Sequence, residues 1–191
     1  MPTRKLLLAL AVATALLATS ACTIQKKGEG KDEKVKIETP VGGLNVDTEA
    51  NPQDVGLAIY PGATLNPKPE GEHSSANVNI SSSLFGVKVI ALDYVSNDPP
   101  AKVIDFYKKE LSKYGSVVEC KGDGKAHFAF GVHDDSSDAL TCKDKPDPGS
   151  NKVEMAVGTK ERERIVSVEP KGSGSKFAVV YVQTRGKEGT L

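Results

Sequence analysis

The first 22 residues combine a basic start, an uncharged apolar run and a string of small side chains. Arg4 and Lys5 precede residues 6–21, a leucine-rich stretch without charge that ends in "LLATSAC". At 16 residues, the apolar run is shorter than the roughly 20 that a membrane-spanning helix needs. Basic end, apolar middle and small residues before a cut are the three parts of a secretory signal, which is removed after export. We therefore expect residues 1–21 to contribute nothing to the folded domain.

The end of this segment resembles the signal peptides of bacterial lipoproteins. Their motif has small or apolar residues three and two places before a cysteine and Gly, Ala or Ser directly before it, which Thr19, Ser20, Ala21 and Cys22 match. Thr19 stands where leucine is usual. The resemblance implies cleavage after Ala21, diacylglycerol on the Cys22 sulfur and a further acyl chain, such as palmitate, on the new amino terminus. Two or more acyl chains hold a protein firmly to a membrane, whereas one holds it only marginally.

Two other readings of this segment stay open. An ordinary signal cut after Ala21 would leave a soluble exported protein with a free Cys22, and an uncleaved segment would itself be the membrane anchor. The lipoprotein resemblance places the chain in the bacterial cell envelope, attached to a membrane through covalent lipid. Thr23 follows the cysteine where Asp would retain a lipoprotein in the inner membrane, so the resemblance implies the outer membrane, facing the periplasm.

The charge balance bears on the partners. The whole chain has 25 basic and 25 acidic residues, and the loss of Arg4 and Lys5 with the signal leaves 23 basic against 25 acidic. A net charge close to zero gives no electrostatic reason to expect nucleic acid as a partner. An envelope protein is the expected partner, and the residues do not identify which one.

Two further cysteines, Cys120 and Cys142, remain once Cys22 is assigned to lipid. An even pair in an oxidising compartment favours a disulfide. A closed loop of about 22 residues stabilises a fold by roughly 3 kcal/mol in the chain-entropy description. A free thiol pair and a metal-binding pair are the alternatives, although the C-x-x-C spacing of tight zinc sites is missing from the sequence.

Composition divides the mature chain into three parts. Residues 22–34 are polar and mixed in charge, as expected of a lipidated N-terminus followed by a flexible tether. Residues 35–184 are of a length suited to a single domain. Residues 185–191 are expected to form a disordered tail.

Hydrophobic periodicity predicts strands before and after one helix. Apolar and polar residues alternate over 35–46 and over 76–94, which indicates two hairpins. Residues 55–65 predict a short strand that ends at a turn, with Tyr60 in the core. After the helix, strands are expected over 116–121, 126–132, 152–158, 164–170 and 176–184.

The helix is the clearest single element of the sequence. Apolar residues recur at a helical spacing at Val103, Tyr107, Leu111 and Tyr114, which predicts one buried stripe. Asn97 or Asp98 is expected to cap the helix, and Gly115 to end it.

Strands, one helix and more strands predict an α+β fold in two layers, an antiparallel sheet with one main amphipathic helix packed on it. The combination of "YPGA", a strand pair, "FYKKEL" and a late strand pair resembles uncharacterised domains of bacterial exported lipoproteins. That resemblance implies no activity.

The best candidates for metal ligands lie between the two cysteines: His127, His133, Asp134 and Asp135, with Asp138 nearby. Two imidazoles and several carboxylates are suitable ligands for zinc, and the aspartates for calcium. The competing interpretation is a solvated loop closed by the disulfide, because Asp-Asp-Ser-Ser-Asp is ordinary loop composition and has no EF-hand spacing.

Catalytic motifs give no comparable signal. The run Gly172-Ser173-Gly174-Ser175 looks like a serine-hydrolase elbow, but the following residues predict a strand where the elbow needs a helix. A nucleophilic Cys120 or Cys142 would have to stay reduced outside the cytoplasm. We therefore expect no enzyme and no cofactor, but a lipid-anchored envelope protein with a non-enzymatic binding or structural domain. The alternative is a metal- or small-ligand-binding lipoprotein that uses the Cys120–Cys142 loop.

Overall fold

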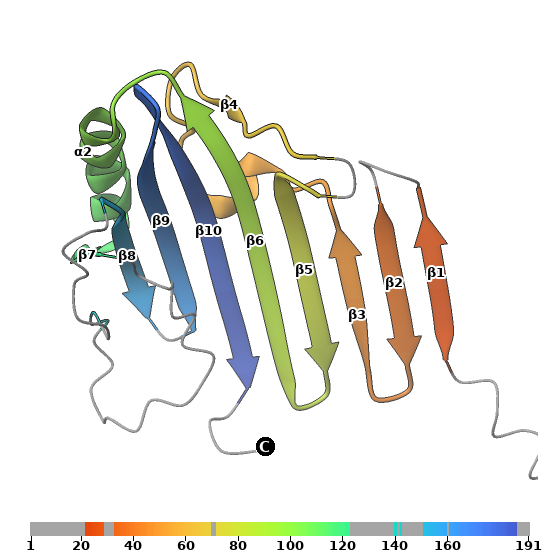
Figure 1. Cartoon of the computed structure of the whole chain (residues 1–191). Coiled ribbons are helices and arrows are strands. Elements are labelled where there is room, and N and C mark those ends of the chain that lie inside the picture. The colour runs from red at the N-terminus through yellow and green to blue at the C-terminus, as the bar shows by residue number, and fades with distance from the viewer. Residues whose placement is uncertain are drawn as a thin grey trace, which may run out of the picture.

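A computed structural model describes residues 22–28, 33–69, 72–122, 140, 142, 151–159 and 161–186. Its strands form one antiparallel sheet in the order β1-β2-β3-β5-β6-β10-β9-β8-β7, and the short β4 pairs with the end of β6 (Figure 1). The strands are β1 (Thr23–Lys27), β2 (Lys34–Thr39), β3 (Gly42–Asp47), β4 (Thr64–Leu65), β5 (Ser75–Ser82), β6 (Phe85–Ser96), β7 (Val118–Lys121), β8 (Val153–Thr159), β9 (Arg162–Lys171) and β10 (Gly174–Gly186).

The two long strands β6 and β10 join the halves of the sheet. β10 lies between β6 and β9, so that Val180 is opposite Ala91 on one side and opposite Ile165 on the other. The β9–β10 hairpin predicted from the sequence is confirmed, and Gly172 in its turn has a φ of 61°, a left-handed conformation that glycine adopts without strain. The last strand of the chain therefore holds the early hairpins against the late ones.

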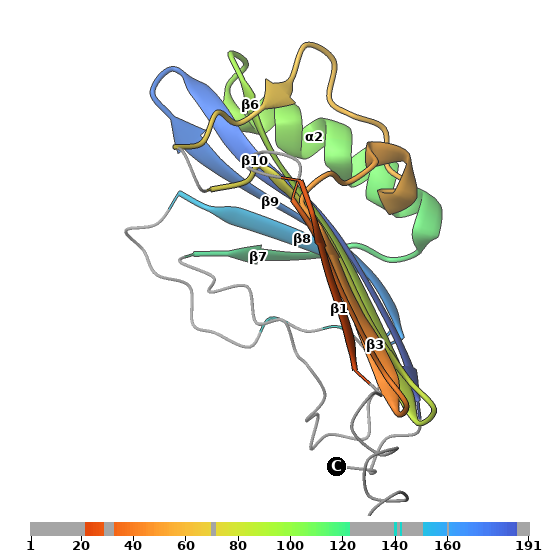
Figure 2. The same cartoon turned by 90° about the vertical axis from the view of Figure 1, so that its right-hand side faces the viewer.

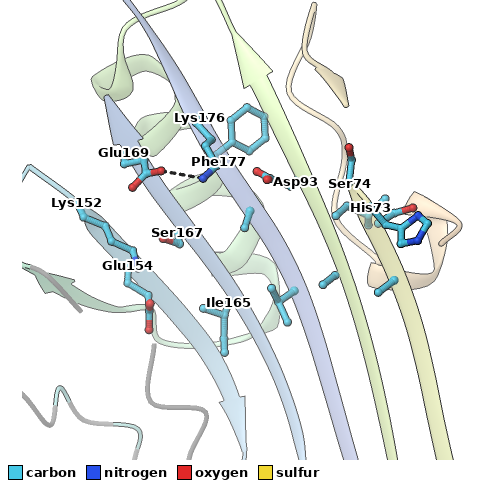
Figure 3. Close-up of a pocket in the computed structure, with 16 residues that line it drawn as sticks. His73, Ser74, Asp93, Lys152, Glu154, Ile165, Ser167, Glu169, Lys176 and Phe177 are labelled. Atoms are coloured by element: carbon cyan, nitrogen blue, oxygen red, sulfur yellow. Dashed lines mark ion pairs between the residues drawn. The ribbon is translucent and has the colours of Figure 1, made fainter. Parts of the chain in front are cut away.

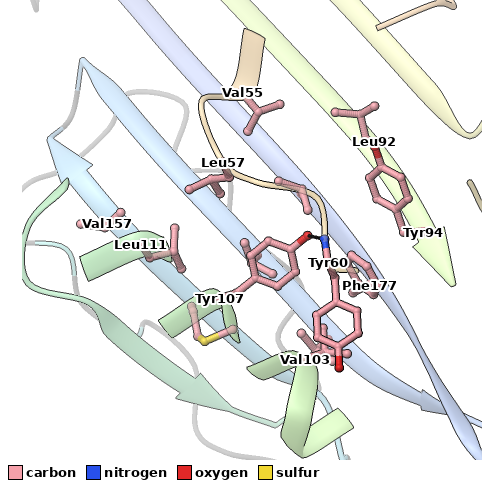
Figure 4. Close-up of a cluster of buried hydrophobic side chains, with 14 of the residues drawn as sticks. Val55, Leu57, Tyr60, Leu92, Tyr94, Val103, Tyr107, Leu111, Val157 and Phe177 are labelled. Carbon is pink, nitrogen blue, oxygen red and sulfur yellow. Dashed lines mark hydrogen bonds between the residues drawn. The ribbon is translucent and has the colours of Figure 1, made fainter. Parts of the chain in front are cut away.

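One α-helix, α2 (Pro100–Leu111), packs against β8, β9 and β10, so the chain is α+β. Val103, Tyr107 and Leu111 form its buried stripe, as predicted, and each is fully buried. Phe177 of β10 lies at the centre of the core, with its ring 5.5 Å from the rings of both Tyr94 and Tyr107 (Figure 4). Tyr107 also accepts a hydrogen bond from the backbone N–H of Tyr60 at 3.2 Å.

Two local predictions about the helix are wrong. Neither Asn97 nor Asp98 caps α2, since the N-cap is Pro99 and no side-chain hydrogen bond caps the helix. Asp98 instead accepts a hydrogen bond from the Nζ of Lys102 at 2.7 Å. Tyr114 is 41% exposed rather than buried, because the chain tightens into the 3-10 helix η3 (Ser112–Tyr114) and turns this side chain out of the stripe.

The apolar run over residues 55–65 differs from its prediction. It contains the end of the 3-10 helix η2 (Pro52–Val55), an irregular segment and the two-residue strand β4. Val55, Leu57 and Tyr60 are nevertheless buried in the core, and Tyr60 is the one that the sequence placed there. Asn51 caps η2 through a bond to the Gln53 amide. Apolar residues thus reach the core without strand pairing.

Both ends of the expected domain extend further than predicted. Part of the segment expected as a tether, residues 22–34, is the edge strand β1, which pairs with β2 from Thr23 opposite Glu38 to Lys27 opposite Lys34. At the other end, β10 continues through Arg185 and Gly186, which were expected in the tail.

Candidate functional site

The face of the sheet that lies opposite α2 is apolar over β2, β3, β5 and β6. Cross-strand pairing aligns Ile37, Leu44, Ile80 and Val87 in one row. A second row runs parallel to it through Val35, Val46, Val78, Val89 and Val182. We call these nine side chains the open face. Eight of them are only partly buried, and Val182 is buried.

The same strands are polar on the other side, beyond the part that α2 covers. Lys36, Asn45, Asn79 and Lys88 lie opposite one another in consecutive strands. Figure 2 shows α2 on one side of the upper part of the sheet, with no described helix over the lower part. Because side chains alternate between the two faces of a strand, this region is amphipathic, with one apolar face and one polar face.

A groove of about 380 Å³ continues the open face toward β8 and β9. Its floor includes Ala91, Ile165 and Val180, and charged side chains stand along its rim (Figure 3). Two of them, Lys176 and Glu169, form an ion pair at 3.1 Å. An apolar floor beside a charged rim suits a ligand or peptide segment that is itself amphipathic.

Glu163 of β9 lies opposite Val182, at the border of the open face. Burial raises the pKa of its carboxyl, and the charge of Glu154 raises it further. The folded chain therefore holds the Glu163 proton more tightly than the unfolded chain. The stability that this group contributes is complete below its unfolded pKa, about 4.3, and is lost as the pH rises through the folded pKa.

Replacing Glu163 with glutamine is expected to raise the melting temperature at pH 7, because the variant no longer ionises a partly desolvated carboxyl. The gain should shrink as the pH falls below about 4.3, where wild type is protonated in both states. Thermal unfolding at several pH values measures it. Glu169→Gln makes the same change on the same strand at an exposed ion pair, and should not raise the melting temperature. A Glu163→Gln variant no more stable than wild type at pH 7 would contradict the expectation.

A cluster that the sequence analysis did not single out lies on the face of the sheet that α2 covers. The Nε of Arg164 donates to the carbonyl of Val55 at 2.9 Å, and its guanidinium lies 3.7 Å from the ring centre of Tyr114. Tyr114 in turn donates to the carbonyl of Gly56. These contacts tie η2 and η3 to β9, which gives the exposed Tyr114 and the charged Arg164 a structural role. Arg164 and Val55 are 109 residues apart in the sequence. No local sequence pattern could therefore reveal their hydrogen bond.

The predicted disulfide is confirmed: Cys120 and Cys142 are bonded, with their Cα atoms 5.6 Å apart. Cys120 belongs to β7 at one edge of the sheet, opposite Glu154 of β8. Cys22 is a free, exposed cysteine at the other edge, directly before β1. The free cysteine and the disulfide-bonded pair therefore lie at opposite edges of the sheet.

The metal ligands proposed from the sequence, His127, His133, Asp134 and Asp135, lie outside the described residues, so the metal site stays a prediction. Within the ranges that the structure does describe, no three His, Cys, Asp or Glu side chains are grouped so as to hold a metal ion. Among those same residues, no helix has both the length and the apolar character to cross a bilayer.

Comparison with models of known protein families, with curated proteins and with solved structures finds no match to this chain.

Proposed function

We propose that this chain is a bacterial lipoprotein, acylated at Cys22, whose domain is a non-enzymatic binding module of the cell envelope, in the outer membrane facing the periplasm. The observation that carries the proposal is the place of Cys22. It is exposed, follows the signal-like residues 1–21 and stands directly before the first strand of the sheet. The exposed position leaves space for an acyl group on the Cys22 sulfur.

The disulfide and the open face support the rest of the proposal. A bonded Cys120–Cys142 pair suits an oxidising compartment outside the cytoplasm. In the proposed arrangement, α2 and the sheet form two layers on one side. The open face on the other side, with its groove, is left for an envelope protein, because contiguous apolar surface of this kind marks interaction sites.

Replacing Cys22 with serine tests the proposal in the bacterium. Acylation needs the Cys22 sulfur, so the variant is expected to lose all incorporation of labelled palmitate and to leave the membrane fraction. Thr23→Ser is the matched control, because it places serine at the next position and keeps the thiol. That variant should be labelled and membrane-bound like wild type. Equal labelling of Cys22→Ser and wild type would contradict the proposal.

A further inference from the structure

Exposed hydrophobic side chains gather at one end of the sheet. Seven large hydrophobic residues are exposed among the described residues, and four of them are Ile24, Val41, Leu84 and Phe85. We call these four the lower tip. Val41 lies in the β2–β3 turn, Leu84 in the β5–β6 turn, and Ile24 and Phe85 near the ends of the adjoining strands. Turns are usually polar, so this concentration is unexpected for an end of the sheet that faces water.

Cys22 lies at the same end. β1 runs upward from Thr23, and the two turns of the lower tip stand beside its start in both views (Figures 1 and 2). The pairing gives the lateral order: Thr23 opposite Glu38, Thr39 opposite Gly42, and Gly42 opposite Ser82. At about 4.8 Å per strand, β1 and β6 are roughly 19 Å apart, so the whole lower tip lies close to Cys22.

Both turns have side chains that satisfy their own backbone. Ser82 Oγ accepts hydrogen bonds from the amides of Leu84 and Phe85 at 3.2 and 3.0 Å and donates to the Phe85 carbonyl at 3.1 Å. Thr39 Oγ1 accepts from the Gly42 amide at 3.1 Å and donates to its carbonyl at 2.8 Å. Pro40, between them, has no amide hydrogen. Backbone groups that are already paired cost less to remove from water.

From these observations we propose that the lower tip inserts into the lipid bilayer beside the acylated Cys22. The inference rests on the proposed function, because the acyl chains on Cys22 determine where the bilayer lies. β1 begins one residue after the anchor, so the tip cannot stand far from the membrane surface. Arg185 of β10 lies opposite Gly86 and is exposed, so its positive charge stands beside the lower tip, where it can contact lipid headgroups. Because the anchor holds the lower tip at the bilayer, lipid is the partner that covers these exposed side chains.

Tryptophan substitution tests the insertion, because the chain has no natural tryptophan. Leu84→Trp, at a 67% exposed position, places the probe in the lower tip. Leu65→Trp is the matched control, at a 47% exposed leucine that pairs with Tyr94 near the far end of β6, nine residues or about 30 Å from Phe85. The lipidated full-length variants are extracted from membranes and reconstituted into phosphatidylcholine–phosphatidylglycerol vesicles, with or without brominated acyl chains.

Brominated lipid should quench most of the Leu84→Trp fluorescence and leave Leu65→Trp unchanged. Equal quenching of the two variants would overturn the inference. The inference would also be overturned if the protein cross-linked as a dimer and the Leu84→Trp fluorescence showed a side chain shielded from water but not quenched by brominated lipid. In that case a second copy of the chain, and not lipid, would cover the lower tip. If Leu84→Trp does not fold, Val41→Trp, at a 76% exposed position, takes its place with the same expectation.

The intact mass of each reconstituted sample separates the two proposals. An acylated chain with an unquenched tip overturns the insertion and leaves the lipid anchor standing. A chain without acyl groups on Cys22 overturns the proposed function, whatever the quenching shows.

Discussion

Replacing Phe177 with alanine is expected to lower the free energy of unfolding by about 4 kcal/mol, because a fully buried phenyl ring is lost and a cavity remains. Phe177 is 1% exposed, and its ring contacts those of Tyr60, Tyr94 and Tyr107. It is the point at which α2, β6 and the segment after η2 meet (Figure 4). For a domain of this size the melting temperature should fall by roughly 10 °C, which thermal unfolding followed by circular dichroism measures.

Phe85→Ala provides the matched control. It removes the same ring from the same sheet, but at a position that is 43% exposed in the lower tip. The loss there should be within about 0.5 kcal/mol, as is usual for surface positions. Two phenylalanine variants that unfold at the same temperature would contradict the assignment of Phe177 to the centre of the core.

Removal of the disulfide is expected to have the next largest effect on stability. Changing both Cys120 and Cys142 to alanine opens a loop with a sequence separation of 22 residues, and should cost about 3 kcal/mol. The melting temperature should then fall by roughly 6–12 °C. The double variant avoids the unpaired thiol that a single substitution would leave.

Reductant supplies the control for this variant. Added to wild type, it should lower the melting temperature toward that of the double variant, and it should leave the double variant itself unchanged. Identical unfolding of oxidised wild type and double variant would show that the Cys120–Cys142 bond does not stabilise the fold.

The sequence predicted the early hairpins better than the burial of their side chains. The alternation over 35–46 and 76–94 indicated two hairpins, because the side-chain period of a strand is two. In β6, however, the core residues are Ile90, Leu92 and Tyr94, whereas the pattern favoured Val87, Val89 and Ala91. It could not show that β10 inserts between β6 and β9, since alternation is the same whichever strand lies alongside. It also could not show that α2 covers the face opposite to these side chains, because an apolar pattern predicts burial without saying what covers it.

Other differences came from local backbone geometry. The apolar residues Val55, Leu57 and Tyr60 led to the prediction of a strand. In the structure, a 3-10 helix begins after Asn51 and places these side chains in the core. The lower tip and the turn bonds of Ser82 become visible only when both hairpins are aligned beside β1. The Cys120–Cys142 bond could be predicted from the sequence, because the expectation that Cys22 is acylated leaves an even pair of cysteines.

The most direct test of the account is the intact mass of the mature protein extracted from bacterial membranes. The account predicts a chain that begins at Cys22, heavier than its sequence by the mass of the acyl groups and lighter by the two hydrogens of the Cys120–Cys142 bond. An unmodified chain found in the soluble fraction, with Cys22 free to react with a thiol reagent, would contradict it.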